Sequence, residues 1–125
     1  MLKEERRNLM SNEIIAQEQP HIFFELYVAG LNFHQYKFIK DQLVVGYHLD
    51  MVREPENEYD QNAVRLYYDG NMLGFVPSRT GEAQVVSRAL EEGVPLEALI
   101  IKHDPEAKVH RRVKFSIKVV EVPFS

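Results

Sequence analysis

An aromatic ring and a carboxylate stand next to each other in a polar segment of the chain, at Tyr59 and Asp60. The segment, residues 54–61, contains Pro55 and Asn57 and separates two strand-like runs, so we expect a surface loop. An aromatic ring can stack on a nucleic-acid base, which contributes about 1 to 3 kcal/mol per base. A carboxylate accepts a hydrogen bond from a hydroxyl group and repels a phosphate. The pair therefore favours the unphosphorylated end of a nucleic-acid strand.

Structural roles are the alternative for the same residues. Asp and Asn side chains commonly bond the backbone two residues further on, so Asp60 and Asn62 are also candidates for turn residues. Tyr59 could close the end of a sheet with its hydroxyl bonded. Phe33, a second candidate for stacking, could belong to the core. The sequence alone leaves both interpretations open.

Cationic candidates lie mostly in the last strand-like run. Its apolar residues share one parity and its polar residues the other, so the basic side chains point away from the core. The apolar set is Val113, Phe115, Ile117 and Val119, and the polar set is Arg112, Lys114, Ser116 and Lys118. Residues 102–118 carry a net charge of +4, which leaves −8 for the remainder. This strip could contact phosphates, or it could be a solvated face that discourages edge pairing.

Two arginines flank the polar loop. Arg53 and Arg65 are candidate groove cations, although either could instead pair with the acidic loop residues at little net energy. The acidic residues of the loop lack the glycine-centred turn of a dedicated calcium loop, so we interpret them as a solvated acidic surface.

The elements that must position these residues are mainly strands, as judged from the apolar periodicity. Strands are expected over residues 22–30, 47–53, 62–68, 72–76, 96–103 and 109–122. Asp69-Gly70 predicts a tight hairpin. A helical turn is expected over 36–43, and a helix after Pro77, capped by Ser78 or Thr80 and ended by Gly93. This pattern predicts a mainly β fold with one or two helices, a small curled antiparallel barrel of the oligonucleotide-binding or SH3-like type.

Length and composition set the outer limits. The 125 residues fit one domain, with a helical extension over residues 1–20 and a barrel over 21–125. The chain is 45% hydrophobic and has no cysteine, which excludes disulfides and thiolate metal sites. Neither a signal peptide nor a membrane span is visible, so we expect a cytoplasmic protein. The net charge of −4 argues against indiscriminate coating of nucleic acid.

Catalytic motifs are missing from the sequence. There is no Gly-rich phosphate loop, no dinucleotide fingerprint and no serine in a nucleophile-elbow context. The five histidines lack metal-ligand spacing. We therefore expect a binding protein, not an enzyme, with no cofactor and no metal.

The stretch of residues 53–64, Arg-Glu-Pro-Glu-Asn-Glu-Tyr-Asp-Gln-Asn-Ala-Val, closely resembles the signature of the HIRAN domain family. That signature runs Arg-Glu/Asp-Pro-x-Asn-x-Tyr-Asp-x-Asn-Ala-Ile/Val. The surroundings agree, with Val-Ala-Gly-Leu at 28–31 and Gly-Phe-Val-Pro at 74–77. The resemblance covers about residues 22–122, and residues 1–20 fall outside it.

The resemblance implies a modified oligonucleotide-binding barrel that binds the 3′ end of single-stranded DNA. In better-known relatives, this domain is a module of proteins that act at stalled replication forks. Carried over by position, Tyr59 would stack on the terminal base and Asp60 would accept a hydrogen bond from the 3′ hydroxyl. Phe33 matches a second stacking position. Asn32 stands where DNA-binding relatives carry a basic residue. The sequence also departs from the family pattern at two other positions. His34 replaces a second aromatic residue, and Ser78 replaces a phosphate-binding lysine, although Arg79 is adjacent to it.

Two hypotheses of function follow. The first is a module that binds single-stranded DNA and prefers a free 3′ hydroxyl. The second is an adaptor that docks protein partners or a second copy of itself, with residues 1–20 as a contact segment and without DNA binding.

Overall fold

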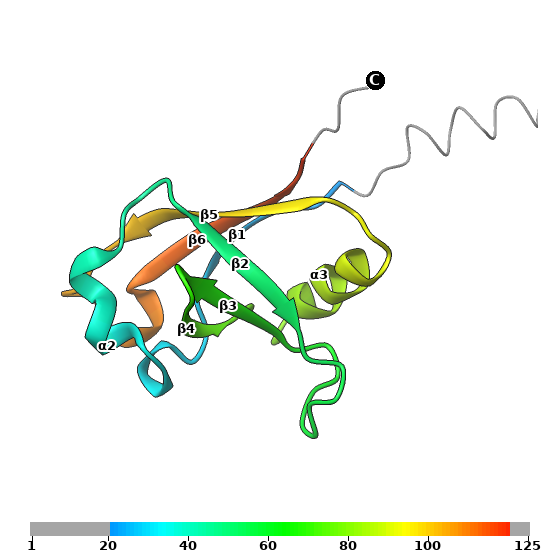
Figure 1. Cartoon of the computed structure of the whole chain (residues 1–125), viewed down its shortest axis with the longest axis horizontal. Coiled ribbons are helices and arrows are strands. Elements are labelled where there is room, and N and C mark those ends of the chain that lie inside the picture. Colours follow the sequence, from blue (N-terminus) through cyan, green and yellow to red (C-terminus); the bar gives the residue numbers. More distant parts are fainter. Residues whose placement is uncertain (1–20, 121–125) are drawn as a thin grey trace, which may run out of the picture.

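The computed structural model describes residues 21–120 and shows six strands curled into one antiparallel sheet (Figure 1). The strands are β1 (Phe23–Tyr27), β2 (His48–Arg53), β3 (Val64–Tyr68), β4 (Asn71–Phe75), β5 (Leu96–His103) and β6 (Val113–Val119). The helices are η1 (Leu31–Phe33), α2 (Tyr36–Ile39), η2 (Lys40–Gln42), α3 (Glu82–Glu91) and η3 (Val109–Arg111). The expected helix within residues 1–20 and the end of the last expected strand, residues 121 and 122, lie outside the described residues.

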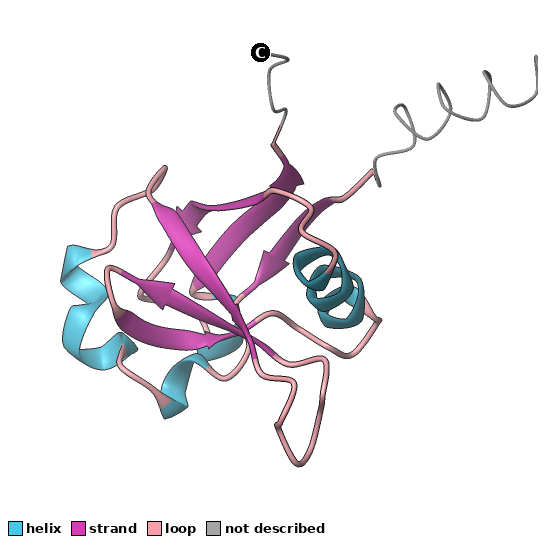
Figure 2. Ribbon diagram, turned by 45° about the vertical axis from the view of Figure 1, so that its right-hand side comes forward, coloured by secondary structure: helices cyan, strands magenta, loops and turns pink. Residues whose placement is uncertain are grey.

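The sheet order is β1-β6-β5-β2-β3-β4, and every pair of neighbours is antiparallel. A bridge between Ala29 and Phe75 joins the two ends of this order, with N···O distances of 2.9 and 2.8 Å. The expectation of a small curled antiparallel barrel is confirmed. In both ribbon views α2 and α3 lie at opposite ends of the sheet (Figures 1 and 2).

Close approach of the backbones makes the bridge possible. Gly74 precedes Phe75, and a Cβ placed on Gly74 would lie 2.2 Å from the carbonyl oxygen of Ala29. That distance is far below a van der Waals contact, so a residue with a side chain cannot occupy this position without moving β1 away from β4.

The core follows the alternation expected from the sequence, except that Ser116, from the set expected to point away from the core, is also buried. In β6 the side chains of Val113, Phe115 and Ile117 are buried, whereas Lys118 is exposed. From α3, Ala83, Val86 and Ala89 are buried at helical spacing. The two chain segments therefore bury their apolar faces in one shared core.

The turn at Asp69-Gly70 is the predicted hairpin. Both residues have positive φ, 48° and 82°, which suits the two-residue turns that follow the twist of paired strands. The helix end at Gly93 is also confirmed, since α3 stops at Glu91 and Gly93 has φ 78°.

Two further details differ from expectation. The residue before α3 is Gly81, in the left-handed region, with no side-chain cap, so the predicted cap by Ser78 or Thr80 is wrong. The Thr80 hydroxyl instead donates to the carboxylate of Glu82. The last strand starts at Val113, because residues 109–111 form a 3-10 turn before it.

None of the helices described within residues 21–120 has the length and apolarity to cross a membrane.

Candidate nucleic-acid interface

The loop between β2 and β3 projects from the body of the protein (Figures 1 and 2). Asn57 orders it: its Oδ1 accepts hydrogen bonds from the backbone N–H of Tyr59 at 2.8 Å and of Asp60 at 3.0 Å. The N–H of Ala63 donates to the carbonyl of Asp60 at 3.1 Å. With its backbone held in this way, the loop leaves the Tyr59 side chain 95% exposed.

Asp60 divides its carboxylate between two surroundings. Oδ1 accepts the backbone N–H of Asn62 at 2.9 Å, so the turn role considered from the sequence is present. Oδ2 has no hydrogen-bond partner within the part of the chain that the structure describes. One oxygen of the half-buried side chain therefore remains available to accept a hydrogen bond.

A cleft of about 360 Å³ opens beside Tyr59 and Asp60. This volume lies within the usual range of small-ligand sites, roughly 300 to 1,000 Å³. The lining combines the end of β1, the β2–β3 loop and the end of β4 with the segment after it. The lining residues are Ala29, Gly30, Asn57, Tyr59, Asp60, Ala63, Phe75, Val76 and Ser78. The Ala29–Phe75 bridge thus forms part of the wall.

Phe33 stands at the border of this cleft. Gly30 lines the cleft and has φ 70°, which turns the chain out of β1 into η1. A Cβ on Gly30 would lie 3.9 Å from a ring carbon of Phe33 and 3.9 Å from one of Phe75, so the two rings flank Gly30. The Phe33 side chain is 77% exposed, which excludes the alternative that it belongs to the core.

Other predicted residues lie close by. Asn32 is exposed on η1 beside Phe33. Arg79 is exposed and follows Ser78, which lines the cleft. The ring of His34 packs edge-on against Phe75 at a centroid distance of 5.6 Å. Asn32, Arg79 and His34 therefore lie near the cleft without entering its lining.

The other predicted cations lie away from the cleft. Arg53 points to α3, where its Nη2 lies 2.7 Å from the Glu91 carboxylate and its Nε donates to Ser87 at 3.1 Å. Lys118 lies 3.7 Å from the carboxylate of Glu97. Lys114 lies over the ring of Tyr27, 5.6 Å from the centroid.

Arg65 takes the role of a partner for the acidic loop. Its Nη2 donates to Glu54 at 2.5 Å, and Nη1 donates to the Tyr67 hydroxyl at 3.2 Å. The hydrogen bond from Arg65 holds the pKa of the Glu54 carboxyl below its ordinary value, and the same bond raises the pKa of Arg65. This pair anchors the first residue of the loop to β3.

Two functional positions were missed from the sequence. Asn57 positions both candidate residues, and Phe75 supplies an aromatic wall of the cleft. Asn57 could have been found from its place two residues before Tyr59, the spacing of an Asx turn. Phe75 could not, because only the closure of β1 on β4 brings it to the cleft.

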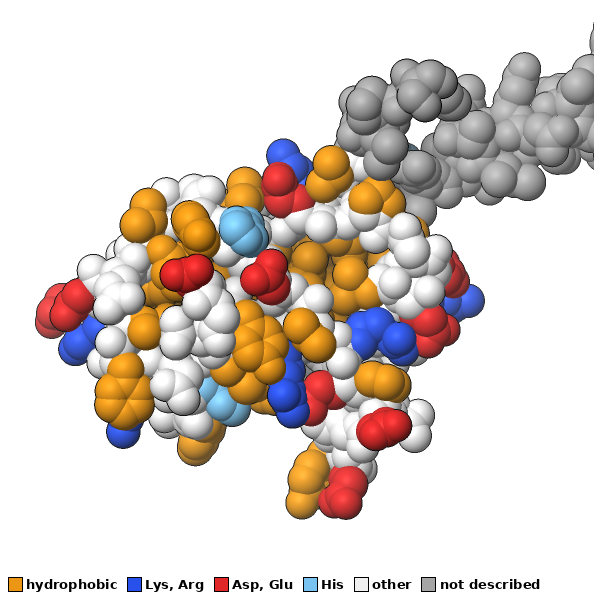
Figure 3. Space-filling view, viewed as in Figure 1, with side chains coloured by type: hydrophobic (Ala, Val, Ile, Leu, Met, Phe, Trp, Pro, Cys, Tyr) orange, Lys and Arg blue, Asp and Glu red, His pale blue; other side chains and the backbone are white. Residues whose placement is uncertain are grey.

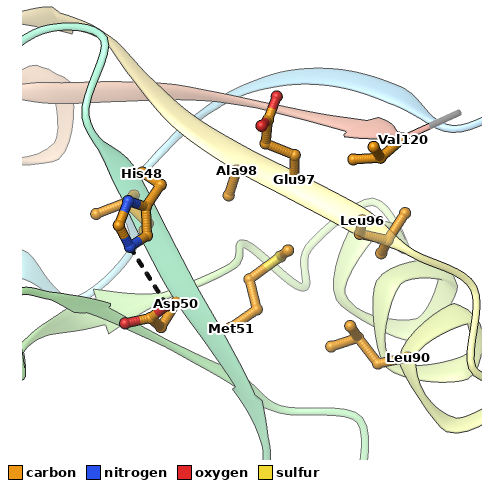
Figure 4. A pocket seen from close by; sticks show the side chains of 9 residues that line it. His48, Asp50, Met51, Leu90, Leu96, Glu97, Ala98 and Val120 are labelled. Carbon is orange, nitrogen blue, oxygen red and sulfur yellow. Dashed lines mark ion pairs between the residues drawn. The ribbon is translucent and has the colours of Figure 1, made fainter. Parts of the chain in front are cut away.

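A second hollow, of about 340 Å³, lies where β2 and β5 diverge (Figure 4). Met51, Leu90, Leu96 and Val120 line it, and His48 lies 3.8 Å from Asp50 at its edge. Its lining contains neither a phenylalanine nor a tyrosine, so it offers less for base stacking than the first cleft. Within residues 21–120, no group of three or more histidine and acidic side chains is placed to hold a metal ion.

Comparison with known proteins adds family information. No curated protein matches the sequence. Among solved structures, the HIRAN domain of human HLTF superposes with a TM-score of 0.58 at 14% identity, covering 78% of this chain and 74% of that chain. A protein from Lactobacillus plantarum gives a TM-score of 0.58 at 18% identity, covering 75% of this chain and 91% of that chain. At these identities the structures establish a shared fold. The model of the HIRAN domain family matches residues 22–120, and the chain therefore belongs to the HIRAN domain family.

Proposed function

We propose that this protein binds the 3′ end of single-stranded DNA and prefers a free 3′ hydroxyl. Tyr59 and Phe33 stack on the last bases, and Oδ2 of Asp60 accepts the hydrogen bond of the 3′ hydroxyl. The observation that carries the proposal is the exposed Tyr59 ring beside an open cleft in which one oxygen of Asp60 has no partner among the described residues.

Exposure of aromatic rings supports this interpretation. Tyr59 and Phe33 are 95% and 77% exposed, although burial of such side chains would contribute roughly 1.5 to 3 kcal/mol to folding. Both lie at the same cleft, and stacking of bases uses exposed rings of this kind. Membership in the HIRAN family supports a nucleic-acid-binding module, since HIRAN is a binding domain and is not catalytic by itself.

The end preference follows from charge. A terminal phosphate would bring its negative charge against Asp60, whereas a hydroxyl donates a hydrogen bond to it. We expect fluorescence anisotropy to show at least tenfold tighter binding of a 5′-labelled oligonucleotide that ends in a 3′ hydroxyl than of one that ends in a 3′ phosphate, about 1.4 kcal/mol.

Variants separate the two contacts. Tyr59→Ala is expected to weaken binding of both oligonucleotides, by roughly fivefold or more, because one base no longer stacks. Asp60→Asn keeps the acceptor for Asn62 but removes the charge, so the two ends should bind with similar affinity. The matched controls are Phe23→Ala, at an aromatic ring 66% exposed on β1, and Asp69→Asn, in the β3–β4 turn. Equal affinity for both ends in the wild-type protein, or no binding of either at low salt, would refute the proposal.

A further inference from the structure

Charge is distributed unevenly around the cleft. The β2–β3 loop on one side carries Glu56 and Glu58 as well as Asp60, whereas the charge of Glu54 is balanced by Arg65, and acidic and hydrophobic side chains mark the projecting end of the loop in Figure 3. Phosphates that follow the bound terminus would be repelled on this side. Repulsion by the loop therefore favours an exit of the strand on the side away from it, where Gly30 lines the cleft and η1 follows.

That opposite side is formed by three segments. η1 packs against η3 and against α2, so residues far apart in the sequence lie next to each other beyond the cleft. Four exposed cationic residues belong to these segments and their ends, and we call them the basic surface. They are Lys37, Lys40, Lys108 and Arg111.

The cations of the basic surface differ from those that are held in ion pairs, although Arg79, Lys102, Arg112 and Lys114 likewise form no ion pair within the described residues. Within the described residues none of the four forms an ion pair, whereas Arg53, Arg65 and Lys118 each lie against a carboxylate. An unpaired cation can bind a phosphate without first giving up a protein partner. The basic surface therefore offers unpaired cations to a nucleic-acid strand that leaves the cleft over η1.

An exposed ring accompanies this charge. Phe38 on α2 is 67% exposed, and the Nζ of Lys37 lies 4.9 Å from the centroid of its ring. Hydrophobic, cationic and acidic side chains lie together at the α2 end in Figure 3. Phe33 is 77% exposed and is the last residue of η1, the element that precedes α2 in the sequence. A ring with an adjacent cation provides one stacking contact and one phosphate contact.

We infer that the nucleotides on the 5′ side of the bound terminus cross η1 onto the basic surface, where a base stacks on Phe38 and Lys37 and Arg111 contact phosphates. This inference rests on the proposed function and extends the binding site beyond the cleft. It gives the site a footprint longer than a dinucleotide, with a fixed strand direction.

The test is a length series of 5′-labelled oligothymidylates with a free 3′ hydroxyl, from dinucleotide to octanucleotide, measured by fluorescence anisotropy. Wild-type affinity should rise with length. Phe38→Ala should weaken binding of the octanucleotide by roughly fivefold or more and leave the dinucleotide unchanged, because only the longer strand reaches α2. Phe23→Ala, which removes an equally exposed ring from β1, is the matched control.

Salt dependence measures how many phosphates the protein neutralises. For single strands the slope of log affinity against log salt changes by about 0.7 for each neutralised phosphate. Lys37→Ala and Arg111→Ala should each reduce the octanucleotide slope by about this amount, and Arg88→Ala, at an exposed position of α3, should not.

The outcomes are distinguishable from those of the proposed function. If Tyr59→Ala weakens every length but the Phe38, Lys37 and Arg111 variants behave as wild type, the proposed function stands and the extended site is refuted. An octanucleotide that binds no better than the dinucleotide also refutes it. If the wild-type protein binds no oligonucleotide of any length, both proposals fail together.

Discussion

Single residues in this protein often perform a local structural task with one atom and leave another atom free. Asp60 stabilises its own turn through Oδ1, and its side chain also lines the cleft. The two interpretations that the sequence left open for Asp60 are therefore compatible. Asn57 acts on the same loop, because its side chain accepts two consecutive backbone N–H groups and so fixes the position of Tyr59.

A part-buried pair gives a prediction at the residue scale. A hydrogen bond of 2.9 Å between the Tyr36 hydroxyl and Nε2 of His103 joins α2 to β5. Burial holds the pKa of His103 below its ordinary value of 6.5, and the carboxylates of Asp104 and Asp41 only partly offset it. Below about pH 6.5 the unfolded chain binds a proton that the folded protein takes up only at lower pH, so stability falls as the pH decreases through this window.

Denaturant unfolding at pH 7 and pH 5.5 measures this effect. His103→Gln keeps a side-chain amide that can hydrogen-bond Tyr36 but has no group that titrates in this range, so the difference in unfolding free energy between the two pH values should shrink. His110→Gln, at an exposed position of η3, is the control and should leave it unchanged. The lowered pKa of the Glu54 carboxyl also stabilises the folded protein, but this contribution to the unfolding free energy is lost only as the pH falls below about 4.5. It therefore does not affect the comparison between pH 7 and pH 5.5. An equal pH dependence in wild type and His103→Gln would contradict the assignment.

At the scale of elements, the contact between β1 and β4 links the fold to the site. The Ala29–Phe75 bridge closes the strand order and places Phe75 in the wall of the cleft. Gly74 permits the approach, since a side chain there would occupy the space of the Ala29 carbonyl. Closure of the barrel and formation of the cleft therefore depend on the same short contact.

Gly74→Ala tests this dependence. The new Cβ would collide with backbone, which cannot rotate away, so we expect a decrease of several kcal/mol in unfolding free energy together with weaker oligonucleotide binding. Gly70→Ala is the matched control: its Cβ would meet nothing within 4 Å, and only its φ of 82° adds strain, roughly 1 to 2 kcal/mol. Chemical denaturation measures both. A Gly74→Ala protein no less stable than Gly70→Ala would show that the close approach is unimportant.

At the scale of the whole molecule, net charge favours ends over continuous strands. The chain carries −4, and several of its cations are neutralised in ion pairs. Non-specific affinity for internal nucleic acid depends on many available cations, so it should be weak here. In the proposed function, an end offers in addition a hydroxyl that donates a hydrogen bond to Asp60.

A circular oligonucleotide tests this balance, because it has the same bases and phosphates but no end. In a competition assay the circle should displace a labelled linear strand at least tenfold less effectively than its linear counterpart does. The linear form with a 3′ phosphate serves as the control, since it has an end but no hydroxyl donor. Equal competition by circle and line would mean that the protein reads internal nucleotides.

The sequence by itself determined the elements and the family. Alternation predicted the strands, Asp69-Gly70 the hairpin and Gly93 the end of α3, because these features depend on local backbone preferences and on the two faces of a strand. The run of residues 53–64 predicted both the family and the loop that carries Tyr59 and Asp60. The cap of α3 was predicted wrongly, because a glycine with positive φ already begins the helix there.

The tertiary structure decided which residues meet. The sequence placed Arg53, Lys114 and Lys118 among the candidate contacts, but the fold directs them to Glu91, Tyr27 and Glu97. It also brings Phe75 to the cleft, and it brings η3 beside η1, which no local pattern could indicate. The physical reason is that an ion pair or a shared cleft depends on distances between segments far apart in the chain, and only closure of the barrel fixes those distances.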